Sequence, residues 1–355
     1  MNATGLILGV ESSCDETAAA VVDNNRNVRS SVIASQDDLH AGFGGVVPEI
    51  ASRAHVERIL PVVTRALADA GVSLHDLDAI AVGNRPGLIG SLLVGVAASK
   101  ALAWSLGKPL IGIDHVRAHL YAGALGRDKP ALPALGLVVS GGHTVIYRVE
   151  SWLDMRRLGS TIDDAIGEAF DKAAAVLGMP YPGGPKLDAL AQTGDEHAHD
   201  FPVSLLGADT LDFSYSGLKT AVLYTVRGRP VRDAGVTRFP RDHTDLTNAE
   251  KANIAASFQE AAIHAVLIKL RRALERPLDA DGSYRSLLIG GGVSANSRLR
   301  AALLALADES DLDLRLPDMR HCTDNAAMIA GLAHERLRTG AVDTLALQAS
   351  PSSAH

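Results

Sequence analysis

Leu6-Ile-Leu-Gly-Val-Glu-Ser-Ser-Cys-Asp-Glu-Thr-Ala-Ala-Ala-Val-Val22 begins and ends in apolar runs that flank a short polar segment ending in Thr17. The same order recurs in Leu135-Gly-Leu-Val-Val-Ser-Gly-Gly-His-Thr-Val-Ile-Tyr-Arg-Val149. Each stretch predicts a strand, a tight turn and a returning strand. We interpret the pair as one duplicated, phosphate-facing hairpin in each of two lobes. Two unrelated hairpins would show the same local pattern.

Composition places the chain among globular proteins and limits its partners. Of 355 residues, 47% are hydrophobic and 21% charged, and the net charge is −7. A nucleic-acid partner would therefore need a local basic patch or a helper protein. Cys14 and Cys322 form no disulfide framework, which indicates a reducing cytoplasm. We expect no membrane association, since there is no signal peptide and no apolar run of roughly 18 residues.

Strands and helices alternate between the two hairpins, which predicts an α/β lobe with a parallel or mixed sheet. Helical spacing is found at 49–70 and 91–106, and strand-like runs at 78–83 and 110–113. A break at 126–130 marks a lobe boundary. We expect residues 1–128 plus 326–340 to form the first lobe, residues 129–325 the second, and residues 341–355 a disordered tail.

Ile113-Asp-His-Val-Arg-Ala-His119 carries two histidines four residues apart. On a helix, His115 and His119 lie on one face and can bind one metal ion. The protease motif H-E-x-x-H needs a glutamate where Val116 stands, so the metal would orient or polarise a substrate. Asp324 could supply the third ligand. The alternatives are two ordinary helical histidines and an aspartate that caps the closing helix.

Further polar residues could hold a nucleotide. Glycine-bearing turns at 140–144, 182–185 and 290–296 could surround a phosphate, although none matches a P-loop or a Rossmann fingerprint. A helix over about 161–177 would place Asp164, Glu168 and Asp171 on one side. We expect Asp171 and Asp188 to accept hydrogen bonds from ribose hydroxyls. A solvated acidic helix face is the alternative.

Nine segments in order along the chain resemble the tRNA N6-adenosine threonylcarbamoyltransferases. They are Glu11-Ser-Ser-Cys-Asp-Glu-Thr17, Gly44-Gly-Val-Val-Pro-Glu49, His115-x3-His119, Val139-Ser-Gly-Gly-His-Thr144, Gly167-Glu-Ala-Phe-Asp-Lys172, Tyr181-Pro-Gly-Gly-Pro185, Phe213-Ser-Tyr-Ser-Gly-Leu-Lys-Thr220, Gly290-Gly-Gly-Val-Ser-Ala-Asn296 and Cys322-Thr-Asp-Asn325. The resemblance implies the two-lobed actin/Hsp70/sugar-kinase (ASKHA) fold, with the ligand between the lobes. It also implies an acyltransferase that moves threonylcarbamoyl from L-threonylcarbamoyladenylate to N6 of adenosine 37 in tRNAs reading codons that begin with A. The products are t6A and AMP.

The same resemblance implies roles for individual residues. The metal ligands would be His115, His119 and Asp324, with Fe2+ as the metal and Zn2+ as the other candidate. Substrate would contact Val138, Val139, Ser140, Gly141 and Gly142, and the adenylate would bind Asp171, Gly184, Asp188 and Asn296. The implied partners are tRNA, threonylcarbamoyladenylate, a paralogous ASKHA-fold subunit and a small P-loop ATPase, all in the cytoplasm. An ATP-dependent Hsp70-like conformational module or scaffold is the alternative function.

Two departures from the family pattern stand out. Arg85, in Asn84-Arg-Pro-Gly87, places a cation near the expected cleft. Residues 226–243 carry five arginines interrupted by glycine and proline, which predicts a mobile loop rather than a helix. We hypothesise that this segment helps to hold the tRNA body, whereas a solvated insertion without a role is the alternative.

Overall fold

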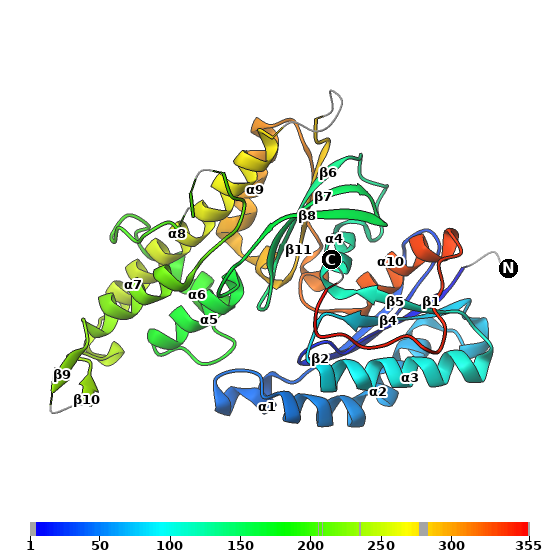
Figure 1. Ribbon diagram of the computed structural model, residues 1–355. Coiled ribbons are helices and arrows are strands. Elements are labelled where there is room, and N and C mark those ends of the chain that lie inside the picture. The colour runs from blue at the N-terminus through cyan, green and yellow to red at the C-terminus, as the bar shows by residue number, and fades with distance from the viewer. Residues whose placement is uncertain (1–4, 205, 208, 234–235, 277–282, 354–355) are drawn as a thin grey trace.

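Two five-stranded sheets of the same topology form the frame of the protein (Figure 1). The computed structural model describes residues 5–204, 206–207, 209–233, 236–276 and 283–353. The first sheet has the order β3-β2-β1-β4-β5 and consists of β1 (Ile7–Glu11), β2 (Glu16–Val22), β3 (Val28–Ser35), β4 (Ala79–Arg85) and β5 (Leu110–Asp114). The second has the order β12-β11-β6-β7-β8 and consists of β6 (Ala134–Val139), β7 (Thr144–Ser151), β8 (Asp154–Ser160), β11 (Ser286–Gly290) and β12 (Asp313–Arg315).

The two sheets match strand for strand. In each, the first three strands pair antiparallel, and the last two extend the sheet in parallel from the first strand. The predicted duplication is therefore confirmed, and unrelated hairpins are excluded. The fold is the expected two-lobed α/β architecture.

Helices cover both outer faces and fill the space between the sheets. The outer face of the first sheet packs against α2 (Pro48–Ala70) and α3 (Ile89–Leu106). The outer face of the second packs against α5 (Ile166–Val176), α8 (Asn248–Leu274) and α9 (Ser297–Glu309). Between the sheets lie α4 (His115–Tyr121) and α10 (Ala326–Arg338), in one buried cluster with inner residues of both sheets. The remaining α-helices and strands are α1 (Asp37–His40), α6 (Gly184–Ala191), α7 (Ser216–Arg227), β9 (Val231–Asp233) and β10 (Val236–Arg238).

Strand alternation decides which β1 residues face the space between the sheets. Leu8 and Val10 pack outward with α2 and α3, whereas Ile7 packs inward. Gly9 and Glu11 share the inward face with Ile7 because side chains alternate along a strand. A Cβ at Gly9 would lie 2.3 Å from the carbonyl oxygen of Ala326. Glycine therefore lets the start of α10 lie directly on β1.

Residues 326–338 join the first sheet despite their position near the end of the chain. Helix α10 packs on β1, β2 and β4. This packing supports the division into lobes at 1–128 plus 326–340 and 129–325, whose boundaries remain a proposal.

The tail corrects one expectation. The backbone amide of Asp343 donates to the Leu110 carbonyl at 2.8 Å, and the Asp343 carboxylate accepts from the Gly112 amide at 2.8 Å. Leu347 is buried with the α2 and α3 residues. Residues 341–353 are thus held by the first sheet rather than disordered, while residues 354–355 lie outside the described part.

Helix α3 corrects the expectation that the chain has no apolar run long enough to span a membrane. Its 18 residues have a mean hydropathy of 1.5, enough by length and composition to cross a membrane. One such helix is weak evidence, because core helices pass the same test. Here α3 packs on β4 and α2 with one face, while only 33% of the helix is buried and apolar side chains such as Trp104 are exposed.

Several local predictions were wrong. Strands β8 and β12 and helix α7 were not predicted. Helix α5 begins at Ile166, so Asp164 does not share a helix face with Glu168 and Asp171. Asp164 instead accepts hydrogen bonds from Lys172 at 2.8 Å and Lys219 at 2.7 Å. The expected loop at 226–243 contains the antiparallel pair β9 and β10.

Candidate active site

The histidine pair lies on α4, immediately after β5. Asp114 caps this helix, since its side chain accepts from the backbone amides of Val116 and Arg117 at 3.1 and 3.2 Å. The helix therefore begins at His115, and His119 follows one turn later. Both side chains are buried, and their rings meet edge to face with centroids 4.6 Å apart.

Asp324 reaches the pair from the segment before α10. The N-cap of α10 is Asn325, whose side chain accepts from the Met328 amide at 3.0 Å. The alternative that Asp324 only caps this helix is therefore wrong. Its Oδ1 lies 3.4 Å from Nε2 of His115 and 3.1 Å from Nε2 of His119.

These three atoms fit a single metal ion. The two Nε2 atoms are 3.2 Å apart, and the three residues form the His/His/Asp group that could hold a cation in the described part of the chain. Ligands bound about 2.1 Å from one ion lie roughly 3.0 to 3.4 Å apart, depending on octahedral or tetrahedral geometry. Two histidines and one carboxylate are a donor set used for Fe2+ and related divalent metals.

A buried carboxylate orients His115. Nδ1 of His115 lies 3.0 Å from Oε2 of Glu11, which is fully buried at the end of β1. The other carboxylate oxygen accepts from the Ser13 amide at 2.6 Å, and the Ser13 hydroxyl lies 3.2 Å from the same Nδ1. A hydrogen bond from Nδ1–H to Glu11 leaves the Nε2 lone pair directed at Asp324 and His119, as in carboxylate–histidine–metal arrangements.

The local charges favour a cation at this point. Burial lowers the pKa of His115, but the negative charges of Asp324 and Glu11 outweigh it and raise the pKa well above its usual value. Burial raises the pKa of Asp324, yet His115 and His119 hold it well below its usual value. Since a metal ion binds these ligands in their deprotonated forms, it would replace the proton on His115.

The turn after β6 lies beside the same group. The pKa of His143 is lowered to about 4, first by burial and then by the positive charges of His115 and His119. The turn is held by its own backbone, because the Ser140 amide donates to the His143 carbonyl at 2.8 Å. A Cβ at Gly141 or Gly142 would meet no atom within 4 Å, so their backbone amides can be approached by a ligand.

Residues of the two lobes influence one another electrostatically. Burial raises the pKa of Tyr181, which follows α5, and the next contributions come from Asp15 and Asp171. Asp15 follows β1, whereas Asp171 lies on α5. The pKa of Glu16 is likewise raised by burial and then by Asp324. The polar turn after β1 is therefore within electrostatic range both of the Tyr181 segment and of Asp324.

The expected adenylate residues form a connected set around α6. Oδ1 of Asp171 accepts from the amides of Gly183 and Gly184 at 2.8 and 2.9 Å. The Asp188 carboxylate accepts from the Ser297 amide at 3.0 Å and the Ser297 hydroxyl at 2.8 Å. Asn296 caps α9 and donates to Gln259 at 2.7 Å. The structure thus brings these residues to one place, where each also has a structural partner.

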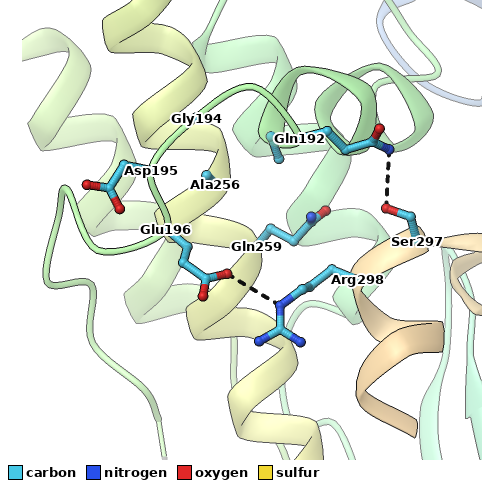
Figure 2. A pocket seen from close by; sticks show the side chains of 9 residues that line it. Gln192, Gly194, Asp195, Glu196, Ala256, Gln259, Ser297 and Arg298 are labelled. Atoms are coloured by element: carbon cyan, nitrogen blue, oxygen red, sulfur yellow. Dashed lines mark hydrogen bonds and ion pairs between the residues drawn. The ribbon is translucent and has the colours of Figure 1, made fainter. Parts of the chain in front are cut away.

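A cavity of about 380 Å³ adjoins this set (Figure 2). It lies among the end of α6, the segment that follows, α8 and the start of α9. Its lining includes Gln192, which donates to Ser297 at 3.3 Å, and Arg298, which pairs with Glu196 at 3.4 Å. Gln259, the partner of Asn296, also lines it. The cavity lies in the second lobe, and its lining includes none of His115, His119 and Asp324.

The structure adds residues that sequence reasoning missed. Glu11, Ser13 and His143 all border the group formed by His115, His119 and Asp324, although the sequence predicted no role for any of them. Glu11 had one usable signal, since it is a lone charge at the end of an apolar strand. Asn84-Arg85-Pro86-Gly87 lies against the same region, because a Cβ at Gly87 would be 2.5 Å from the Ser13 carbonyl.

Two duplicated α/β lobes with a His/His/Asp group between them define an ASKHA-type protein with a candidate metal-binding site. Solved structures agree on the fold. HypF from T. kodakarensis aligns with a TM-score of 0.60 and 15% identity over 95% of this chain and 48% of that chain. The activator of the 2-hydroxyisocaproyl-CoA dehydratase from Clostridium difficile aligns with a TM-score of 0.52 and 13% identity over 94% and 96%.

Sequence relatives identify the family. Residues 27–331 match the family described as tRNA N6-adenosine threonylcarbamoyltransferase. Proteins of that name from Rhodopirellula baltica and Moorella thermoacetica are 48% and 49% identical to this chain. The alignments cover 92% of this chain and 91% of the first relative, and 97% and 96% for the second. The chain belongs to the tRNA N6-adenosine threonylcarbamoyltransferase family.

The reaction follows from membership. The protein is an acyltransferase that forms t6A at adenosine 37 of tRNA. The names of the relatives do not favour an ATP-driven module.

The contact of Glu11 with His115 predicts a measurable effect on metal affinity. Glu11→Gln keeps the size of the side chain but removes its charge, so it should weaken metal binding by roughly 10- to 100-fold. Competition with a chromophoric chelator measures this. Glu57→Gln, an exposed change on α2, should leave the affinity unchanged. Equal affinities for the two variants would exclude Glu11 as the group that orients His115.

Proposed function

We propose that His115, His119 and Asp324 hold one divalent metal ion, with Fe2+ favoured over Zn2+. The observation that carries this proposal is the approach of two Nε2 atoms and Asp324 Oδ1 to within 3.1–3.4 Å of one another. A bound metal would polarise the carbonyl of the threonylcarbamoyl group and fix its orientation. Glu11 and Ser13 would keep the His115 ring in place.

The adenylate would extend from this centre into the second lobe. Val138, Val139, Ser140, Gly141 and Gly142 would contact the reacting end, since the amides after Ser140 are open to a ligand. Asp171, Gly184, Asp188 and Asn296 would bind the nucleoside end. Ionised carboxylates accept hydrogen bonds from ribose hydroxyls, and the adjoining cavity is within the usual range of about 300–1,000 Å³ for ligand pockets.

Positioning explains most of the chemistry that these residues can supply. The adenine N6 amine is a weak nucleophile because its lone pair is delocalised into the ring. Its attack forms a nitrogen–carbon bond and breaks the bond between the carbonyl carbon and the phosphate oxygen, so that AMP leaves. Backbone amides at Gly141 and Gly142 could stabilise the developing negative charge. The phosphate of the departing AMP could accept the proton released from N6.

Helper proteins and the compartment complete the proposal. Exposed apolar side chains of α2 and α3 include Val56, Leu60, Leu93 and Trp104. Such a face is typical of a protein contact, and we assign it to the paralogous ASKHA-fold subunit. A small P-loop ATPase would act with that pair. The setting would be the cytoplasm, where two unpaired cysteines are stable.

Removing one metal ligand tests the proposal. Asp324→Ala should lower both metal content and the yield of t6A, because the two histidines alone bind a metal weakly. Elemental analysis gives the first quantity. Mass spectrometry of tRNA nucleosides, after incubation with threonylcarbamoyladenylate and helper proteins, gives the second.

A matched aspartate controls for the loss of charge. Asp318→Ala changes a half-exposed residue of the same segment and should leave both quantities near wild type. Full metal occupancy in Asp324→Ala would remove Asp324 from the ligand set. Normal t6A yield in a metal-free variant would remove the metal from the reaction.

The adenylate assignment has its own test. Asp171→Asn keeps an oxygen that can accept from Gly183 and Gly184 but lacks the negative charge. Affinity for AMP should fall by about 1.5–3 kcal/mol, the range for hydrogen bonds to charged groups. Calorimetry with AMP measures it, and Asp154→Asn on β8 is the control. An unchanged affinity would mean that Asp171 serves only the backbone of α6.

A further inference from the structure

Residues 226–233 and 236–243 form a basic projection on an acidic protein. It contains five arginines and two aspartates, a formal net charge of +3, whereas the whole chain carries −7. Strands β9 and β10 pair antiparallel there, with Arg232 opposite Thr237 and Arg238 opposite Val231. In Figure 1 the pair projects from the end of α7, at the edge of the molecule farthest from the first sheet.

The base of the projection is tied to the second lobe. The Arg241 amide donates to the Arg227 carbonyl at 3.1 Å, and the Arg241 guanidinium donates to the Thr225 carbonyl at 2.9 Å. Arg227 lies 3.8 Å from the Asp242 carboxylate and 6.0 Å from the centre of the Phe239 ring. Gly228, with φ +76°, lets the chain turn against Pro240. Two of the five arginines thus hold the base in place.

The other three arginines are directed to solvent. Arg229, Arg232 and Arg238 are exposed, and none of these three side chains forms an ion pair or a hydrogen bond with the described residues. Arg232 and Arg238 lie on opposite faces of the two-stranded ribbon, because facing partners share a side and neighbours alternate. By contrast, Arg271 at the end of α8 pairs with Glu309 at 2.6 Å. These three arginines are therefore available to contact an anion from outside.

We propose that this ribbon binds the phosphate backbone of tRNA, away from the metal centre. The inference rests on tRNA being the substrate. A polyanion as large as tRNA approaches a net acidic protein most favourably where positive charge is concentrated. Arginine suits this role because its planar guanidinium can donate two hydrogen bonds to one phosphate. An acidic protein partner would need the same charge, so the test must separate the two.

Replacing the three exposed arginines tests the inference. Arg229→Gln, Arg232→Gln and Arg238→Gln are combined in the full-length chain, and binding of an unmodified tRNA transcript is followed over a salt series. Each lost phosphate contact should reduce the slope of log affinity against log salt by roughly 0.7–0.9, so the slope should fall by about 2–3. Affinity at low salt should fall roughly ten- to hundredfold. AMP affinity should stay at the wild-type value.

A charge-matched variant supplies the control. Arg29→Gln, Arg156→Gln and Arg157→Gln change three exposed arginines outside the ribbon and lower the net charge equally. The inference is supported only if the ribbon variant loses markedly more affinity and slope than this control. Equal losses of affinity and slope in the two variants would show an effect of net charge alone and would overturn the inference. An unchanged slope beside lost binding of a helper protein would assign the ribbon to a protein partner instead. If the ribbon variant binds tRNA with wild-type affinity and salt slope, the inference is wrong. Formation of t6A by the wild-type chain and its helper proteins would then show that the proposed function is unaffected.

Discussion

The approach of α4 and α10 between two sheets is the constraint on which the rest of this structure depends. His115 and Asp324 are far apart in the sequence, yet their side chains meet because each element is fixed to the same sheet. Helix α4 follows β5 directly, and α10 lies on β1 where Gly9 removes the side chain that would hold it away. Glu11, at the end of β1, then fixes the His115 ring from behind. A buried polar group of this kind is costly unless its members have partners. The fold supplies partners for Glu11, His115 and Asp324, whereas Nδ1 of His119 has none among the described residues.

The duplicated architecture divides the work between two lobes. The first sheet and α10 bring together His115, His119 and Asp324, whereas the second lobe contributes the Ser140–His143 turn and the residues around α6. In the proposed function the reacting carbonyl lies between them, so small changes in the packing of one lobe on the other would alter its position. Positioning can lower a barrier by roughly 7–11 kcal/mol, so a precise interface matters for a reaction with a weak nucleophile. A second close contact supports this view, since a Cβ at Gly290 would lie 2.2 Å from the His119 carbonyl oxygen.

Much of this arrangement could be predicted from the sequence, for identifiable reasons. The hairpin duplication was visible because both hairpins are apolar runs of strand length. The histidine pair was visible because a spacing of four residues has one meaning on a helix. Strand β12 is too short to give a periodic signal, and β8 contains two adjacent arginines and few apolar residues. The start of α5 was misplaced because acidic residues before a helix resemble a first turn, and only the partners Lys172 and Lys219 show otherwise. The role of Glu11 depends on a contact 104 residues distant, which no local pattern contains.

The most direct test of this account is X-ray absorption spectroscopy at the metal edge of protein reconstituted with Fe2+. Asp324 and the two histidines predict a first shell of nitrogen and oxygen that includes two imidazoles, and loss of one imidazole in His119→Ala. A first shell without imidazole scattering, or one that His119→Ala leaves unchanged, would contradict the claim that this group holds the metal.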